Sequence, residues 1–412
     1  MDLMSRDPSL GLSDSTTRVL AVATVDATPW GLLRPWLHAL RASGYDVHIA
    51  CAPGDYCGRL AAEGFHMHPV SLRRRFNPFV HIRPLFQLYK LVRQGRFVVV
   101  NTHTPVAAGV GRTAAWLAGC KNIVYTVHGF YFHENMFRLW RWLFVGIEWL
   151  LGRCTVLFMF VSDEDRRTAI QTGIARPAAE TVTIYNGIDL SVFLPKSSCA
   201  DEIERDKREC GIPQAHRVIG IVGRIVKEKG HREFFEIARE LLQKRGDLLF
   251  LVVGDSLPSD RDQYGPILRR RVREEGLDGH FLFTGLTSEV PKYLRIMDIF
   301  VLPSYREGFP RSVLEAMATE LPVVGTNIRG CREAVVHGRT GFIVPPKDAK
   351  ALAKAVAFLL EHPGKAQEMG RAGRERAVKL YDQRMVADRF VAAFDRLLNK
   401  SASSKEAVAA CD

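Results

Sequence analysis

The sequence lacks the features that mark several common classes of protein. Its eight cysteines stand singly, without a Cys-x-x-Cys pair or a metal-ligand spacing, which predicts reduced thiols and excludes a disulfide scaffold. The most apolar segment, 139–161, is interrupted by Arg141, Glu148 and Arg153, so it falls short of the roughly 18 clean apolar residues of a membrane span. No basic segment precedes an apolar core at the start, so we expect no secretory signal and a cytoplasmic protein.

Two cofactor motifs are also missing from the strand ends of the second half of the chain. These strand ends carry no Gly-x-Gly-x-x-Gly, which argues against a nicotinamide dinucleotide, and no Gly-Lys-Ser/Thr of a P-loop. No Asp-x-Asp among the strand ends stands out as a divalent-ion site. We therefore expect neither a cofactor nor a metal in the reaction.

Basic residues outnumber acidic residues. The 412 residues include 57 Lys and Arg against 45 Asp and Glu, a formal net charge of +12. This surplus predicts an anionic partner, which could be phosphate groups, a lipid surface or nucleic acid. No RNA- or DNA-binding motif accompanies the charge, so we do not expect nucleic acid.

Apolar runs alternate with helical patterns along the whole chain, which predicts an α/β protein with parallel sheets covered on both faces. The runs number twelve, and the polar segment 195–217 divides them six and six, as expected for two doubly wound, Rossmann-like domains joined by a linker. We assign residues 1–194 to the first domain and 195–382 to the second, with a C-terminal helix from 383 that returns to the first domain. The ends, about 1–15 and 400–412, are polar and predicted to be disordered. The runs are "RVLAVATV", "DVHIACA", "FVVVNTH", "NIVYTVHG", "TVLFMFVS", "TVTIYNG", "RVIGIVGR", "LLFLVVGD", "HFLFTG", "IFVLPS", "LPVVGT" and "GFIVPP".

The segment "VGRIVKEKGH" carries two cations beside a predicted strand end. Arg224 follows Gly223 directly after the strand, and Lys229 lies five residues on, at the start of the next helix. Ligands bind at the carboxyl ends of parallel strands, and two cations near a helix N-terminus make a good diphosphate clamp. A surface loop with solvated charges is the alternative.

The segment "PSYREGFPRSVLEAMATELPVVGT" places Glu307 in a turn and Glu315 inside a helix. Ser312 followed by Glu315 is a capping-box pattern, so Glu315 could serve only the helix N-terminus. Glu307 could be an ordinary turn residue. The functional alternative is that both carboxylates reach one ligand and accept hydrogen bonds from sugar and ribose hydroxyls.

Five motifs in order resemble the family 4 retaining glycosyltransferases, which have the GT-B fold. "REGFPRSVLEAMA" resembles the E-x7-E motif of that family, and "GRIVKEKG" its Gly-Arg…Lys-Gly element. "TIYNGIDLSVF" and "RGCREAVVHGRTGFIVPP" resemble two further elements. "VNTHTPVAAGVGRTAAWLAG" with "YTVHGFYFHE" resembles the first domain of members that build bacterial capsular polysaccharides or exopolysaccharides. The resemblance covers roughly residues 18–396.

The resemblance implies roles for individual residues. Glu315 would bind the nucleotide ribose, Glu307 would lie at the donor sugar, and Arg224 with Lys229 would clamp the diphosphate. His128 would contact the sugar from the first domain; alternatively it is a core histidine bonded to a backbone carbonyl. His103, at another strand end, is a second candidate. The expected donor site also includes Gly223, Gly308, Phe309, Pro310 and Ser312, of which Gly308 to Pro310 would discriminate between sugars.

The implied activity is retaining hexosyl transfer from a nucleoside diphosphate sugar, which we expect to be UDP-linked. The acceptor would be a glycan or a polyprenyl-diphosphate-linked sugar in cell-surface polysaccharide synthesis. Many relatives have a Gly-Gly pair after the first strand, where this chain has Pro29-Trp30-Gly31, so the acceptor site is expected to differ. A sugar-nucleotide epimerase of the same architecture, or a non-catalytic sugar-nucleotide-binding subunit, remains an alternative.

Basic and aromatic residues cluster in the first half, in segments 72–97 and 136–153. A basic surface bearing Trp and Phe suits an anionic bilayer, so we expect peripheral attachment to the inner face of the cell membrane. The alternative is that the aromatic side chains are core and the arginines are solvated. The residues in question are Arg73, Arg74, Arg75, Phe76, Phe79, Arg83, Phe86, Tyr89, Lys90, Arg93, Arg96, Arg138, Trp140, Arg141 and Trp142.

Overall fold

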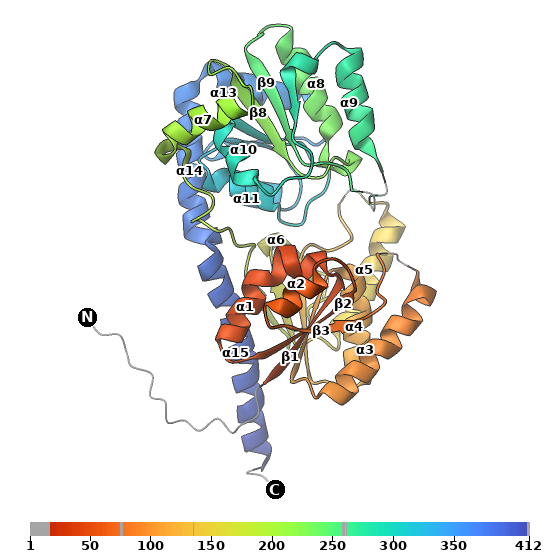
Figure 1. Cartoon of the computed structure of the whole chain (residues 1–412). Coiled ribbons are helices and arrows are strands. Elements are labelled where there is room, and N and C mark those ends of the chain that lie inside the picture. Colours follow the sequence, from red (N-terminus) through yellow and green to blue (C-terminus); the bar gives the residue numbers. More distant parts are fainter. Residues whose placement is uncertain (1–16, 75–76, 135, 258–259, 261, 410–412) are drawn as a thin grey trace, which may run out of the picture.

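A computed structural model describes residues 17–74, 77–134, 136–257, 260 and 262–409. Within these residues all strands belong to two parallel sheets, one in each of two lobes (Figure 1). The sheets are covered by helices on both faces, which confirms the predicted α/β class. The continuous burial of strands such as β1 (Arg18–Val25) is what covering on both faces requires.

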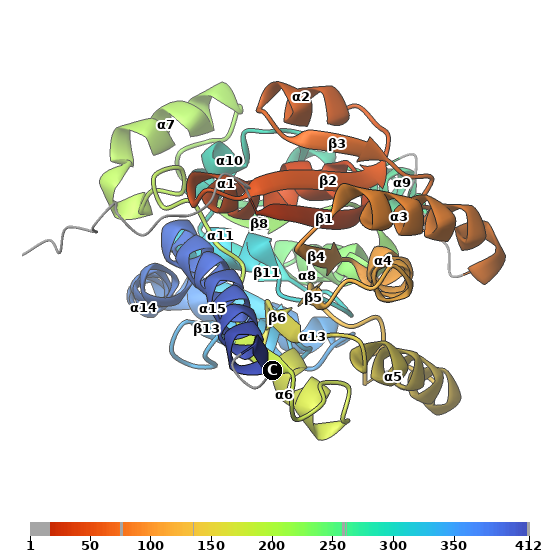
Figure 2. The same cartoon turned by 90° about the horizontal axis from the view of Figure 1, so that it is seen from below.

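The N-terminal domain has a seven-stranded sheet in the order β3-β2-β1-β4-β5-β6-β7. Figure 2 shows helices α3, α4 and α5 on one side of it and α1 and α15 on the other. Its further strands are β2 (Asp46–Ala52), β3 (His66–Pro69), β4 (Val99–His103), β5 (Asn122–Val127), β6 (Leu157–Phe160) and β7 (Glu180–Thr183). Its helices are η1 (Pro29–Leu33), α1 (Arg34–Ala42), α2 (Cys57–Ala62), η2 (Pro78–His81), α3 (Ile82–Gly95), α4 (Pro105–Leu117), α5 (Arg138–Gly152) and α6 (Asp163–Gln171).

The C-terminal domain has a six-stranded sheet in the order β10-β9-β8-β11-β12-β13. Its strands are β8 (Arg217–Val222), β9 (Leu248–Val253), β10 (Phe281–Phe283), β11 (Ile299–Leu302), β12 (Val323–Thr326) and β13 (Gly341–Val344). Its helices are η3 (Lys196–Ser198), α7 (Ala200–Glu209), η4 (Lys227–Lys229), α8 (His231–Leu242), α9 (Tyr264–Glu274), η5 (Asp278–His280), α10 (Val290–Ile296), α11 (Arg311–Ala318), α12 (Cys331–Ala334), α13 (Ala349–Glu361) and α14 (Pro363–Tyr381).

All twelve predicted strands form, but two predictions about the chain between them were wrong. The edge strand β3 was missed, because its four residues, His-Met-His-Pro, are short and only half apolar. The segment 195–217 is more than a linker, since it contains α7, whose buried Asp206 receives a 2.7 Å hydrogen bond from Arg295 of α10. Most residues of α7 are charged, so the face of the helix that packs on the domain could not be recognised from the sequence.

The last helix, α15 (Gln383–Ala409), leaves the C-terminal domain and packs on α1 of the N-terminal domain (Figure 1). Phe390 of α15 stacks on Trp36 with ring centroids 5.0 Å apart, and Tyr45 donates a 2.6 Å hydrogen bond to Asp395. The helix continues to residue 409, so the disorder expected from about 400 was wrong for that part. Residues 1–16 and 410–412 lie outside the described residues.

No helix in the described part of the chain combines the length and the apolar character needed to cross a bilayer.

Phe390→Ala should lower the free energy of unfolding by about 3–5 kcal/mol, because a fully buried aromatic ring leaves a cavity against Trp36. Chemical denaturation measures this, with the exposed Arg384→Ala as control. A loss below about 1 kcal/mol would mean that α15 is not part of the N-terminal core.

Candidate active site

The predicted site residues lie on loops at the carboxyl ends of the strands, where the two domains face each other. Arg224 follows β8, and Lys229 ends the 3-10 turn η4 just before α8. Glu307 lies in the loop between β11 and α11, and His128 follows β5 of the other domain. This edge is where ligands bind in open parallel sheets.

Lys229 and Glu307 form the central contact of the site. Lys229 Nζ donates a 2.6 Å hydrogen bond to Glu307 Oε1, and the hydroxyl of buried Ser304 donates to the same oxygen at 2.8 Å. The Glu307 side chain is only 11% exposed, so its charge depends on these donors. The Lys229 ammonium has three donors in all, which leaves capacity for an anionic ligand beside Glu307.

Arg224 is held differently. Its guanidinium pairs with Asp260, and its side chain is half exposed. Gly223, which precedes it, and Gly254 at the end of β9 approach each other closely: a Cβ on Gly254 would lie 2.3 Å from the Gly223 carbonyl oxygen. The two backbones lie so close at these strand ends that a side chain on Gly254 would clash, and a ligand can therefore approach the backbone directly.

Glu315 does not cap the helix, so the capping-box interpretation was wrong. Helix α11 begins at Arg311 with Pro310 as its N-cap and no capping side chain, so Ser312 already lies within the first turn. Burial raises the pKa of Glu315, although Arg311, 3.8 Å away, partly offsets this. A carboxylate that is mostly buried, with its cation 3.8 Å away and beyond hydrogen-bond distance, is costly, and this is consistent with a carboxylate that waits for ligand hydroxyls.

The loop after Glu307 touches the other domain through its backbone. A Cβ on Gly308 would lie 2.1 Å from the carbonyl oxygen of His128, and a Cβ on Gly129 would lie 2.8 Å from the Gly308 Cα. Phe309 is buried at the domain junction, where its carbonyl accepts a 2.8 Å hydrogen bond from Asn186. The Phe309 side chain therefore serves packing, and of the three predicted sugar-discriminating residues Gly308 lies nearest to His128.

His128 pairs with the second candidate histidine rather than with a backbone carbonyl. Its Nε2 lies 3.1 Å from Nδ1 of His103. Burial lowers the pKa of His128 to about 4 and holds that of His103 well below its usual value, so both rings are neutral at pH 7. Among the described residues the other ring nitrogens, Nδ1 of His128 and Nε2 of His103, are buried without a hydrogen-bond partner. These two buried nitrogens are left with capacity for one hydrogen bond each, which a ligand hydroxyl could use.

A cavity of about 130 Å³ opens between the domains next to Glu307. Four arginines and three carboxylates, Glu307 included, line it. Arg332 is paired with Glu134 and Glu164, and Arg329 with Asp165, so Arg141 and Arg306 are the arginines better placed to meet an anionic ligand. Sequence reasoning missed most of these side chains, although some belong to segments already matched to the family. The lining residues are Phe132, His133, Glu134, Arg141, Glu164, Thr168, Tyr305, Arg306, Glu307, Ile328, Arg329 and Arg332.

Two side chains from the C-terminal domain hold the domains together beside this cavity. Arg329 donates a 2.5 Å hydrogen bond to the buried Asp165 and others to backbone carbonyls of residues 130 and 132. Glu333 accepts hydrogen bonds from Ser162 and from the backbone N–H of Asp163, at 2.5 and 2.6 Å, and so caps helix α6 of the other domain. The Asp-Glu-Asp at 163–165 is used in these and related ion pairs, not as an open metal site.

An apolar groove of about 680 Å³ adjoins the cavity. It lies between η2 and α3 on one side and α4 and α5 on the other, and Phe132 lines both hollows. Gly109 and Val110 form its floor on α4, and Trp140 and Leu143 contribute from α5. Sequence reasoning identified the aromatic residues of α5 but not the groove.

Models of two glycosyltransferase domains match the chain. "Glycosyltransferase Family 4" matches residues 35–192, and "Glycosyl transferases group 1" matches residues 202–376. Together they cover most of both lobes. The chain belongs to glycosyltransferase family 4.

Relatives of this glycosyltransferase include curated bacterial enzymes. It is 29% identical over 288 residues to the Escherichia coli UDP-Gal:alpha-D-GlcNAc-diphosphoundecaprenol alpha-1,3-galactosyltransferase, covering 69% of this chain and 72% of that enzyme. It is 26% identical over 375 residues to the Staphylococcus aureus capsular polysaccharide biosynthesis glycosyltransferase CapM, covering 90% and 95%. The resemblance inferred from the motifs is thereby confirmed at the level of family and activity.

A solved structure confirms the GT-B fold. The glycosyltransferase superposes on Anabaena Alr3699/HepE, crystallised with UDP, with a TM-score of 0.77 and 19% identity over 92% of this chain and all of that chain. The roles of the individual site residues stay predictions, which the contacts of Lys229 and Glu307 allow to be tested.

Lys229→Ala and Arg224→Ala should each lower kcat/KM by about 30- to 1,000-fold, equivalent to roughly 2–4 kcal/mol, because each removes a donor positioned for a departing anion. Steady-state release of the nucleotide product measures this. Lys227→Ala is the matched control, since Lys227 is an exposed cation of the same turn. Rates within about threefold of wild type for both variants would remove the two cations from the mechanism.

Proposed function

We propose that the chain is a retaining glycosyltransferase that transfers a sugar from a nucleoside diphosphate sugar to a lipid-diphosphate-linked acceptor at a membrane surface. The observation that carries this proposal is that one residue, Phe132, lines both the arginine-rich cavity beside Glu307 and the apolar groove. A ligand that spans both hollows needs an anionic head and an apolar tail. A polyprenyl diphosphate bearing a sugar has this chemistry.

The name of the Escherichia coli relative supports both substrates, since that enzyme uses UDP-Gal and a diphosphoundecaprenol acceptor. On this chain, the donor diphosphate would lie against Lys229 and Arg224, with the ribose hydroxyls at Glu315. The donor sugar would lie between Glu307 and the unpaired Nδ1 of His128. The link of CapM to capsular polysaccharide favours a role in cell-surface polysaccharide synthesis.

The reaction needs no side chain as nucleophile. The bond between the anomeric carbon and the diphosphate oxygen breaks, and the acceptor hydroxyl oxygen bonds to that carbon on the same face. The hydroxyl proton passes to an oxygen of the leaving diphosphate. Lys229 and Arg224 stabilise the negative charge that grows on that group, and Glu307, held by Lys229 and Ser304, orients the sugar hydroxyls. Retention is proposed on the family resemblance.

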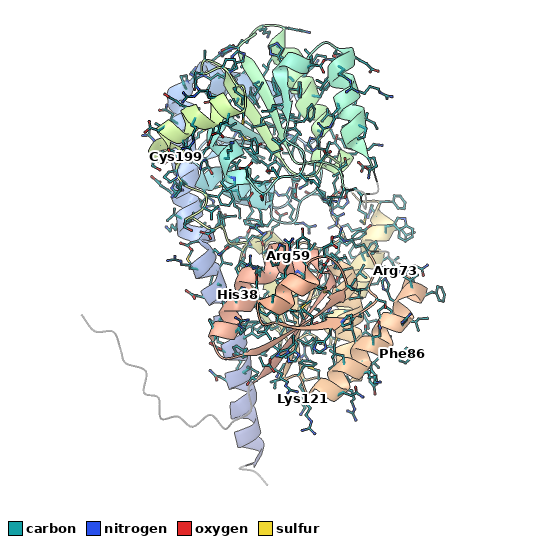
Figure 3. The ribbon with its side chains drawn as sticks, in the orientation of Figure 1. His38, Arg59, Arg73, Phe86, Lys121 and Cys199 are labelled. Carbon is teal, nitrogen blue, oxygen red and sulfur yellow. The ribbon has the colours of Figure 1, made fainter. Side chains whose placement is uncertain are left out.

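The exposed surface around the groove supports attachment to a membrane. Most of the aromatic residues expected there are exposed rather than core: Phe79 is 78% exposed, Phe86 66%, Trp140 57% and Trp142 64%. Figure 3 shows Phe86 and Arg73 at the outer edge of the N-terminal lobe. Arg75 and Phe76, which were part of this prediction, lie outside the described residues. Exposed aromatic and basic side chains on the helices that form an apolar groove suit the headgroup region of an anionic bilayer.

Release of free nucleoside diphosphate from a panel of nucleoside diphosphate sugars tests the proposal, with and without a sugar-bearing undecaprenyl diphosphate in detergent micelles. Transfer predicts release that depends on the lipid acceptor. An epimerised donor without any acceptor would indicate the epimerase alternative. Donor binding without turnover on any acceptor would indicate a non-catalytic subunit.

Gly109→Leu should raise the KM for the lipid acceptor at least about tenfold while turnover on a short water-soluble acceptor persists, because the new side chain fills the groove and not the cavity. A Cβ at Gly109 meets only Leu151, at 3.9 Å, so the helix should accept the change. Gly146→Leu makes the same change at an exposed position of α5 that does not line the groove, where an added Cβ meets nothing within 4 Å, and it should change neither value. An unchanged lipid KM in Gly109→Leu would place the acceptor tail elsewhere.

Arg73→Ser/Arg74→Ser should release part of the protein from anionic vesicles, since each basic residue near the surface contributes about 1 kcal/mol. Trp140→Ala/Trp142→Ala should reduce the fraction that remains bound in high salt, where charge is screened. Co-sedimentation measures both, and the exposed pair Arg270→Ser/Arg273→Ser on α9 is the control. Wild-type protein that stays in the supernatant at low salt would mean that this surface is merely solvated.

A further inference from the structure

Three polar side chains meet at the edge of the N-terminal sheet that lies away from the cleft. Asp46 is the first residue of β2 and His48 lies two residues later, on the same face of the strand. His66 is the first residue of the edge strand β3 and pairs in register with His48. Because the amino ends of the parallel strands lie opposite the cleft, this cluster takes no part in the glycosyl-transfer site.

The ligand atoms of the cluster converge. Nε2 of His48 lies 3.1 Å from Oδ2 of Asp46, and Nε2 of His66 lies 3.3 Å from Oδ1. All three ligand atoms lie within 4.8 Å of one another. A tetrahedral zinc ion with bonds of about 2.0–2.2 Å separates its ligands by roughly 3.3–3.6 Å, so small side-chain adjustments would close the cluster around an ion.

A fourth residue orients the cluster. Nδ1 of His48 lies 2.8 Å from Nε2 of His68, the next residue of β3 on the same face. If His48 donates this hydrogen bond, its Nε2 carries a lone pair toward the Asp46 carboxylate, an arrangement that a cation stabilises. Metal-binding histidines usually donate their other ring N–H to a carboxylate, a backbone carbonyl or water, and here Nε2 of His68 takes the place of that acceptor.

The surrounding charges and burial bear on the protonation of these ligands. Burial lowers the pKa of His48 and of His68, although the Asp46 carboxylate opposes this at His48. Neutral imidazole and carboxylate are the donors that zinc-class ions prefer. Arg18 opposes a second cation, because its Nε lies 3.4 Å from Oδ2 of Asp46, but its side chain is half exposed and has room to move into solvent.

We propose that Asp46, His48 and His66 form a site for one divalent transition-metal ion of the zinc class, with His68 as a positioning residue. The bound ion would tie the four-residue edge strand β3 to β2. Three protein ligands leave one coordination position for water. Such a cross-link would protect an otherwise exposed sheet edge and would stabilise the N-terminal domain without touching the cleft.

Titration of the chelator-stripped full-length chain with zinc chloride, followed by calorimetry, tests the proposal. We expect one ion per chain with micromolar affinity, a rise in melting temperature, and, with cobalt chloride, the intense visible absorption of a four-coordinate ion. His48→Asn and His66→Asn should abolish the one-site isotherm, and His68→Asn should weaken it about 10- to 100-fold.

His38→Asn is the matched control. His38 on α1 also faces a carboxylate, with Nε2 2.8 Å from Glu63, and Figure 3 shows it on a separate helix. This variant should bind zinc like wild type, and glycosyl transfer should be unchanged in His48→Asn. Equal weakening in the His38 variant, or binding only at millimolar zinc, would overturn the proposal and leave a hydrogen-bonded histidine network.

Discussion

The geometry of the active site depends on an exchange of charged side chains between the two domains. Glu333 of the C-terminal domain caps helix α6 of the N-terminal domain, and Arg329 pairs with the buried Asp165. Burial raises the pKa of Asp165 to about 6 despite the arginine, which shows how completely the interface removes this carboxyl from water. A charge buried at an interface is stable only with its partner in place, so these pairs favour one relative position of the two sheets.

That position brings the backbone at His128 and Gly129 against Gly308. The preceding residue, Glu307, then lines the cavity between the domains, and Lys229 donates a hydrogen bond to its carboxylate. The result is a cavity with a surplus of arginines that continues into an apolar groove. Some of the basic residues behind the net charge of +12 therefore line the cleft, and others lie on the basic outer surface.

Much of this arrangement could be predicted from the sequence. Buried parallel strands appear as continuous apolar runs, and the residues that directly follow these runs form the active site. Arg224, Lys229 and Glu307 follow strands at the cleft, as expected. Strand β3 was missed because half of its residues are histidines, and the proposed metal site offers a reason for their presence. The capping box predicted at Glu315 was wrong because the N-cap of α11 is Pro310. Ser312 therefore lies inside the first turn and cannot be the N-cap residue.

The inter-domain contacts could not have been predicted by local reasoning. Asp165 and Arg329 are 164 residues apart in the sequence, and no local pattern around either residue indicates that the two side chains form a pair. The groove likewise depends on how α3, α4 and α5 are spaced, since α3 and α5 taken alone show only exposed aromatic and basic residues and α4 taken alone shows only small and apolar ones around the buried Arg112.

A crystal structure of the chain with bound UDP tests the central claim most directly, because the free protein pairs both proposed diphosphate ligands with carboxylates. The account predicts that Arg224 turns from Asp260 toward the diphosphate, that Lys229 donates to the diphosphate while it keeps its bond to Glu307, and that Glu315 accepts hydrogen bonds from the ribose hydroxyls. A nucleotide bound elsewhere, with Arg224 still paired with Asp260 and no ribose at Glu315, would contradict it.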